Sequence, residues 1–276
     1  DQYFLLESVE GGSSGRYSFL GFRPKLTVAC KGGTVKVKEN GMVRVLSGTP
    51  KEALQTLLNT YRSPQIEGLP PFTGGLVGYF AYEMIQYAEP KLRIKQSDMN
   101  DYELMLFDKL IVFDHLHHKL CFIINAKTQE GEAGYRKAAA DLETFVETIR
   151  VTEPIPHEKQ PPAPEFTCNF SKEEYCTVVE RTKQFIKEGD IFQGVISRRF
   201  EADYEGSLLN AYRVLRTTNP SPYMYFIKLK EMQIAGTSPE TMVKLTNRKL
   251  MTFPVAGTRR RGKDREQDTA LEKELL

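Results

Sequence analysis

Two tight-turn signals constrain the first half of this 276-residue chain more than any other feature. Gly32-Gly33 and Asn40-Gly41 each stand between short runs that are rich in β-branched residues. Turns of this kind join neighbouring antiparallel strands, because glycine and asparagine tolerate the positive φ that the turns need. The sequence therefore predicts a strand-rich first half. The expected strands cover residues 16–21, 25–30, 34–38 and 42–46.

Helices are expected to interrupt these strands. Pro50 suits the first turn of a helix, where its missing N–H would have no partner, and Ala53 and Leu57 follow on one apolar face. From Glu132, apolar side chains recur every three or four residues, which indicates a second amphipathic helix. The glycine-spaced apolar run 74–82 is typical of a core strand, or of close packing between a strand and a helix.

A proline-rich stretch between Thr152 and Glu165 divides the chain. Proline at this density cannot continue a helix or a sheet. We therefore expect an N-terminal domain over residues 1–150, a linker over 151–166 and the first part of a second domain over 167–276.

The second half opens with a clear helix signature. Ser171 and Glu174 form an S-x-x-E capping box, and Gly189 is a typical terminating glycine. A strand is expected over 191–200, in which Gln193 would stand as a polar amide among apolar neighbours, or simply at a sheet edge. The remaining expected elements are a helix over 207–216 and strands over 223–229, 232–235 and near 249–253.

Composition narrows the functional classes. The net charge of +2 gives no field for attracting polyanions, and the basic run Arg259 to Arg261 has no interleaved aromatic residues, so we expect no nucleic-acid partner. We expect no membrane span either, since the chain has no long apolar run. Together with the lack of a signal peptide, this indicates a cytoplasmic location.

Cysteine and histidine provide little evidence for a metal site. The four cysteines lack metal-ligand spacing and are expected to be buried free thiols. His115, His117 and His118 lie between two apolar runs, which favours a solvated hairpin turn over a metal site.

Three polar segments interrupt the second half where packing does not require them. Glu240, in Ser-Pro-Glu, is either a helix-capping acid or a catalytic acid that burial would keep protonated. The stretch Ala256-Gly257-Thr258 offers backbone N–H groups and a hydroxyl, a small receptor for a carboxylate. The segment 219–225 is a proline-fixed turn followed by aromatic and thioether side chains, which suit an apolar ligand.

Taken in order, the motifs of this chain resemble anthranilate synthase component I, the large subunit that belongs to the chorismate-utilising enzymes. The motifs are LLES, GRYSFLG, PFTGGLVGYFAYE, DIFQGVISRR, NPSPYMY, GTSPE and PVAGTRRRG. The resemblance implies an α+β fold, in which two large antiparallel β-sheets pack as a sandwich with helices on the outside and the catalytic part is incomplete.

The resemblance also implies roles for individual residues. Chorismate and ammonia would give anthranilate and pyruvate, with Glu240 assisting departure of the hydroxyl group and Gly257 and Thr258 contacting chorismate. Feedback inhibition by L-tryptophan would use a site formed from both halves of the chain. The residues assigned to that site are Ser8, Asn219, Ser221, Pro222, Tyr223 and Met224.

Two positions distinguish relatives with other products. Isochorismate and salicylate synthases typically carry a lysine at the position of Gln193, and an amide cannot activate water as that base does. Aminodeoxychorismate synthase typically carries a lysine at the position of Ala256, and an alanine cannot form its covalent intermediate. Both residues favour direct amination of chorismate and an anthranilate product.

Further expectations follow from the resemblance. It implies Mg2+ as a cofactor, with ligands beyond Leu276, and a glutamine amidotransferase subunit, anthranilate synthase component II, as the source of ammonia. Two alternatives stay open: aminodeoxychorismate synthase component I, or a catalytically incomplete fragment that binds tryptophan.

Overall fold

The computed structural model describes residues 2–8, 15–95, 97–150, 162–255 and 257–275. These form two compact units. The first unit combines the described residues up to 150 with those from 208 onward, and the second contains those from 162 to 207. Most of the expected linker, residues 151–161, lies outside the described residues, and the division into two functional domains stays a prediction.

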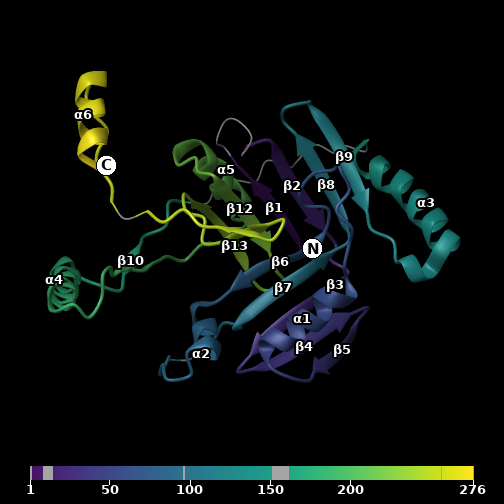
Figure 1. The fold of residues 1–276 in the computed structure, drawn as a ribbon, viewed down its shortest axis with the longest axis horizontal. Coiled ribbons are helices and arrows are strands. Elements are labelled where there is room, and N and C mark those ends of the chain that lie inside the picture. The colour runs from purple at the N-terminus through teal and green to yellow at the C-terminus, as the bar shows by residue number, and fades with distance from the viewer. Residues whose placement is uncertain (1, 9–14, 96, 151–161, 256, 276) are drawn as a thin grey trace. The chain divides into compact units, whose positions relative to one another are not determined.

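The first unit is built around two antiparallel sheets (Figure 1). The six-stranded sheet has the order β13-β12-β1-β2-β8-β9. Its strands are β1 (Tyr3–Glu7), β2 (Tyr17–Phe22), β8 (Lys109–Asp114), β9 (Lys119–Ile124), β12 (Tyr223–Lys228) and β13 (Gln233–Ser238). The five-stranded sheet has the order β5-β4-β3-β7-β6. Its strands are β3 (Leu26–Lys31), β4 (Thr34–Glu39), β5 (Met42–Leu46), β6 (Gly75–Phe80) and β7 (Tyr102–Phe107). The four strands expected between residues 16 and 46 are confirmed as β2 to β5.

The six-stranded sheet unites both halves of the sequence. Strand β12, green in Figure 1, pairs with β1, purple, so that Leu5 lies opposite Phe226 and Glu7 opposite Met224. Strand β2 pairs with the other edge of β1. The N-terminal strand is therefore an interior strand whose second neighbour comes from the C-terminal half.

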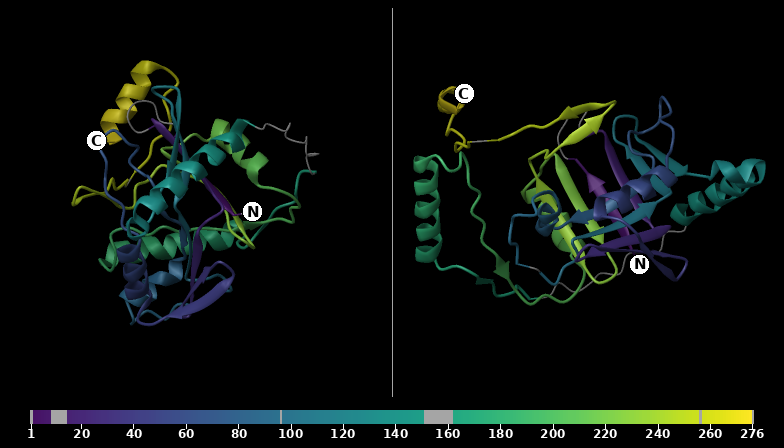
Figure 2. Two further views of the ribbon diagram at one scale, coloured as in Figure 1. Left: turned by 90° about the vertical axis from the view of Figure 1, so that its right-hand side faces the viewer. Right: turned by 60° about the horizontal axis from the view of Figure 1, so that its bottom comes forward.

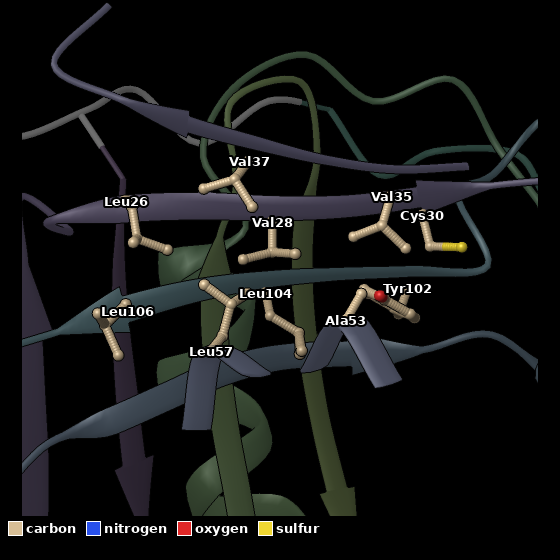
Figure 3. Packing of buried hydrophobic residues seen from close by; sticks show 10 residues of the cluster. All are labelled: Leu26, Val28, Cys30, Val35, Val37, Ala53, Leu57, Tyr102, Leu104 and Leu106. Carbon is tan, nitrogen blue, oxygen red and sulfur yellow. The ribbon is translucent and has the colours of Figure 1, made fainter. Parts of the chain in front are cut away.

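Strand β7 packs against other elements on both sides of its sheet, because side chains on both of its faces are buried. Tyr102, Leu104 and Leu106 point to the face covered by helix α1 (Pro50–Thr60), with Ala53 and Leu57 opposite them (Figure 3). Met105 and Phe107 alternate with them and belong to a second cluster. That cluster also contains Phe4, Leu110, Val112 and Ile227 of the six-stranded sheet. Period-2 alternation thus makes β7 the link between a helix layer and a sheet layer.

Helices cover the sheets from outside. Phe145 of α3 (Gly131–Arg150), teal in Figure 2, contacts the rings of Phe22 in β2 and Phe122 in β9. Tyr212 of α5 (Leu209–Thr218) is buried against Phe226 of β12. Both expected helices in the first half are confirmed, and the fold is α+β with two packed antiparallel sheets.

The remaining elements are short or local. They comprise α2 (Ile85–Ala88), α6 (Arg265–Leu275), the single-turn 3-10 helices at Tyr82–Met84 and Thr128–Glu130, and the paired strands β14 (Lys244–Thr246) and β15 (Lys249–Met251). The second unit contains α4 (Lys172–Glu188) and the paired strands β10 (Thr167–Cys168) and β11 (Phe200–Glu201). Ser171 caps α4 in a complete capping box, and Gly189 ends the helix at a φ of 84°, as expected.

The strand expected over 191–200 is wrong for most of its length. Only Phe200 and Glu201 form strand β11, and residues 191–199 pair with no strand in the described part of the chain. A strand requires a neighbour whose N–H and C=O groups match its own, and alternation in the sequence cannot provide one. Gln193 and the fully exposed Phe192 therefore lie in irregular chain.

The histidine segment forms the hairpin turn between β8 and β9, as expected. His117 Nδ1 lies 2.9 Å from a carboxylate oxygen of Asp114, which also accepts a 2.7 Å hydrogen bond from Arg16. The hydrogen bond from Arg16 holds the pKa of Asp114 well below its usual range. Among the described residues, no group of three or more His, Cys, Asp or Glu side chains could hold a metal ion.

All four cysteines are free, but the expectation that they are buried is wrong for two of them. Cys30 is buried and Cys121 is half-buried, whereas Cys168 and Cys176 are exposed. The second unit has fewer side chains to cover its elements, and α4 has no buried residue. In the described part of the chain, no helix is long and apolar enough to cross a membrane.

Three tyrosines should make the protein sensitive to alkali. Burial raises the pKa of Tyr87, Tyr102 and Tyr212 above the usual range, and hydrogen bonds to Asp101 and Glu7 raise those of Tyr87 and Tyr212 further. Tyrosine side chains in the unfolded chain have a pKa of about 10. Above that pH the unfolded state binds fewer protons, so the free energy of unfolding should fall as the pH rises.

Denaturant titrations between pH 8 and pH 11.5 would test this, with absorbance at 295 nm reporting phenolate. Tyr87→Phe should reduce the alkaline loss of stability. A free energy of unfolding that stays constant above pH 10 would contradict the expectation.

Candidate functional site

An apolar cavity of about 600 Å3 lies between the two sheets of the first unit. Strand β1 contributes Leu6 and Glu7 to its lining, and β12 contributes Tyr223, Met224 and Tyr225. The rest of the lining comes mainly from β6. These residues are Leu76, Val77, Gly78, Tyr79 and Phe80. A volume of this size falls within the usual range for small-molecule sites.

Ser8 directly follows β1 and is the next residue after Glu7, which lines the cavity. Its hydroxyl oxygen is buried and has no hydrogen-bond partner among the described residues. A buried hydroxyl without a partner costs free energy, so such a group commonly marks a place where a ligand or water completes the bonding.

The proline-fixed turn lies at the same end of the sheet. Because Glu7 stands opposite Met224, the register brings Ser8 to the start of β12. Tyr223 and Met224 line the cavity. Ser221 is buried in the turn, with 8% of its surface exposed, and the Asn219 carbonyl accepts a 3.0 Å hydrogen bond from the Thr237 hydroxyl. The residues that the resemblance assigns to tryptophan therefore lie at one end of one sheet, although they come from opposite halves of the chain.

Sequence reasoning missed Glu7, whose side chain is only 8% exposed. Its carboxylate accepts a 2.8 Å hydrogen bond from the Tyr212 hydroxyl and forms a 3.2 Å ion pair with Arg216. Both partners belong to α5, so Glu7 fixes this helix to β1 beside the cavity. The sequence signal that could have identified Glu7 is its position as a carboxylate in the apolar run of LLES.

The Ser-Pro-Glu segment follows directly after β13. The Glu240 backbone N–H donates to Ser238 Oγ at 3.3 Å, which makes a local turn. The side chain of Glu240 is exposed, so the described residues do not bury its carboxyl group. Its role as a catalytic acid stays a prediction.

Gly236, just before this segment, is approached closely by a side chain of the neighbouring strand. A side chain at position 236 would overlap the ring of Tyr225, which lies opposite it in β12. This close approach explains why a glycine precedes Thr-Ser-Pro-Glu.

The other expected chorismate residues are further from regular structure. Gly257 and Thr258 are exposed in the segment before α6, and Ala256 lies outside the described residues. Gln193 belongs to the second unit and is also exposed. In the neighbouring basic run, Arg259 pairs with Glu274 at 3.1 Å and Arg261 with Asp268 at 2.7 Å. The roles of these residues in chorismate binding stay predictions.

Comparisons with known proteins agree with the fold and with the ordered motifs. The family model described as chorismate binding enzyme matches residues 1–276. Anthranilate synthase component 1 of Acetivibrio thermocellus is 38% identical over 285 residues, which cover 99% of this chain and 58% of that protein. The protein of the same name from Saccharomyces cerevisiae is 36% identical over 284 residues, with 99% of this chain and 54% of that protein covered.

A solved structure is also similar to this chain in fold. The crystal structure of anthranilate synthase component I from Streptococcus pneumoniae superposes with a TM-score of 0.77 at 29% identity, and the match covers 98% of this chain and 58% of that chain. The present chain thus spans little more than half the length of the curated relatives that it matches. Because the family model matches it from residue 1 to residue 276, the chain belongs to the family of chorismate-binding enzymes.

Proposed function

We propose that this chain is the regulatory and partly catalytic portion of an anthranilate synthase large subunit. The enzyme would convert chorismate and ammonia to anthranilate, pyruvate and water in tryptophan biosynthesis. One observation carries the proposal beyond the family. Tyr223 and Met224 line an apolar cavity together with Leu6 and Glu7 of β1, and Ser8, whose hydroxyl has no partner among the described residues, directly follows Glu7.

The proposed chemistry begins with amination at C2 of chorismate. As the C2–N bond forms, the two conjugated ring double bonds shift and the C4–O bond breaks, and Glu240 would give the departing hydroxyl the proton that turns it into water. Thr258 and the backbone of Gly257 would bind a substrate carboxylate. Elimination of pyruvate then yields the aromatic ring. Gln193 and Ala256 would favour this route, because neither side chain is a base or a nucleophile comparable to lysine.

The cavity is the proposed site for L-tryptophan as a feedback inhibitor. Its lining of apolar and aromatic side chains suits an indole ring, and the Ser8 hydroxyl could bond the polar end of the amino acid. Asn219, Ser221 and Pro222 would support the turn that presents Tyr223 and Met224.

Other parts of the proposal rest on the resemblance to anthranilate synthases. A glutamine amidotransferase subunit would supply ammonia, and the enzyme would act in the cytoplasm. Mg2+ would be a cofactor, although no group of three or more His, Cys, Asp or Glu side chains among the described residues could hold a metal ion.

Product analysis tests the proposed reaction. The complete polypeptide that carries these residues, given chorismate, Mg2+ and ammonium, should produce fluorescent anthranilate. Formation of 4-amino-4-deoxychorismate would instead identify an aminodeoxychorismate synthase.

Calorimetric titration of the 276-residue chain with L-tryptophan tests the proposed inhibitor site. The wild-type chain should bind, and Ser8→Phe should weaken binding at least about tenfold, because it removes the unpartnered hydroxyl and places a bulky ring next to the cavity residue Glu7. Equal binding by both proteins would place the ligand elsewhere. Binding by a complete polypeptide that has no synthase activity would favour a purely tryptophan-binding role.

A further inference from the structure

We propose that Thr241 is a positioning residue that transmits occupancy of the cavity to Glu240, through a hydrogen bond with the phenol of Tyr223. This inference rests on the proposed function, since it concerns how the proposed inhibitor site would act on the proposed catalytic acid. It names a residue and a bond that neither the sequence motifs nor the comparisons assign.

Strands β12 and β13 are neighbours in the six-stranded sheet. Strand β12 starts at Tyr223 and β13 ends at Ser238, and these two residues stand opposite each other in the antiparallel pair. The turn that lines the cavity and the loop that carries Glu240 therefore leave the sheet at the same end, side by side.

A hydrogen bond between side chains joins these two segments. The Tyr223 hydroxyl is hydrogen-bonded to Thr241 Oγ1. Thr241 directly follows Glu240 in the chain, so a displacement of the Thr241 side chain moves the backbone that carries the Glu240 carboxyl. Tyr223 is also a lining residue of the cavity. One aromatic residue thus contacts both the cavity and the Glu240 loop.

Local hydrogen bonds also hold the loop that carries Glu240. The Ser238 hydroxyl bonds both the N–H and the carbonyl of Glu240, at 3.3 Å and 3.4 Å. Thr252 donates to the Thr241 and Met242 carbonyls at 3.4 Å and 3.0 Å. A loop fixed at both ends by local bonds moves largely as one piece. The Tyr223 contact would therefore set the position of Glu240 and not only that of Thr241.

A second hydrogen bond joins the same two segments, between Thr237 of β13 and Asn219. The Thr237 hydroxyl donates to the Asn219 carbonyl at 3.0 Å. It fixes the start of the turn to β13 and leaves the Tyr223 bond as the side-chain link to the loop after β13. Ligand contact with the Tyr223 ring would then change the geometry of this link.

The test measures a coupling factor in the complete polypeptide that carries these residues. The dissociation constant for L-tryptophan is determined by calorimetry with and without saturating chorismate, in the absence of an ammonia donor so that no amination occurs. The ratio of the two constants is the coupling factor, and it is reciprocal between the two ligands. A change in overall stability alone would not move this ratio.

Two variants remove the bond from either side. Tyr223→Phe keeps the ring and removes the hydroxyl, and Thr241→Val keeps the shape and removes the partner oxygen. Each should lower the coupling factor about fivefold, the equivalent of one net hydrogen bond. The double variant should lower it by the same factor, because both changes remove one bond. Thr246→Val, in the neighbouring hairpin β14–β15, serves as the matched control and should leave the factor unchanged.

Full coupling in Thr241→Val and Tyr223→Phe, in a wild-type background that does couple, would overturn the inference while leaving the proposed inhibitor site intact. A wild-type protein that binds no tryptophan would overturn the proposed regulation, and the inference with it.

Discussion

Phe4→Ala should lower the free energy of unfolding by about 3–5 kcal/mol, because it leaves a cavity where the two sheets meet. The Phe4 side chain is fully buried in the interior strand β1. Its ring contacts that of Phe107, with centroids 4.7 Å apart and planes at 73°. Phe107 belongs to the other sheet, so the substitution removes a contact that holds the sandwich together. Urea titration at neutral pH measures the change.

Phe192→Ala is the matched control. It removes the same atoms from a fully exposed position and should change the free energy of unfolding by no more than about 0.5 kcal/mol. Gly21 offers a second check, since a Cβ at position 21 would overlap the ring of Phe4. Gly21→Ala should therefore be destabilising in the wild-type chain and much less so beside Phe4→Ala. If the two substitutions changed the free energy of unfolding additively, the close contact between position 21 and the Phe4 ring would be contradicted.

Gly78→Ala should lower the free energy of unfolding by about 3 kcal/mol, the upper part of the usual range for overpacking and a large effect for the addition of one methyl group. Gly78 lies in β6 opposite Leu104 of β7. A Cβ at position 78 would overlap the carbonyl oxygen of Glu103 and lie 2.8 Å from the Leu104 Cα. Backbone atoms cannot rotate aside as a side chain does, so the strand pair would have to separate.

Gly21→Ala provides the comparison for this prediction as well. There the obstructing atoms belong to the Phe4 and Phe107 side chains, which can shift, so the cost should be smaller than at position 78. Since Gly78 also lines the cavity, Gly78→Ala should in addition weaken tryptophan binding. Equal free energies of unfolding for Gly78→Ala and the wild type would show that β6 and β7 leave room for a side chain at position 78.

Local signals in the sequence predicted local structure well. The hairpin turns at Gly32-Gly33 and Asn40-Gly41 adopt the positive φ that their residues allow, and the capping box at Ser171 forms as expected. Each of these features depends on residues within a few positions of one another. The physical cause is therefore contained in the sequence pattern itself.

Pairing between distant segments was beyond such reasoning. Nothing in the local pattern of β1 indicates that β12 will be its neighbour, and only the resemblance suggested that the two halves meet near Ser8. The strand expected over 191–199 does not form for a related reason. An alternating sequence does not specify a pairing partner, and without one the segment stays irregular. The roles of Glu7 and Thr241 depend on contacts across strands and helices, which spacing does not encode.

The interior position of β1 has a consequence for how the chain is made. Synthesis proceeds from the N-terminus, so β1 and β2 emerge long before residues 223–228 exist. Until β12 arrives, one edge of β1 is an unpaired template for other strands. Closure of that edge requires a contact of very high sequence separation, which makes it a slow step. We therefore expect the newly made chain to depend on chaperones, and to aggregate when translation stops before residue 228.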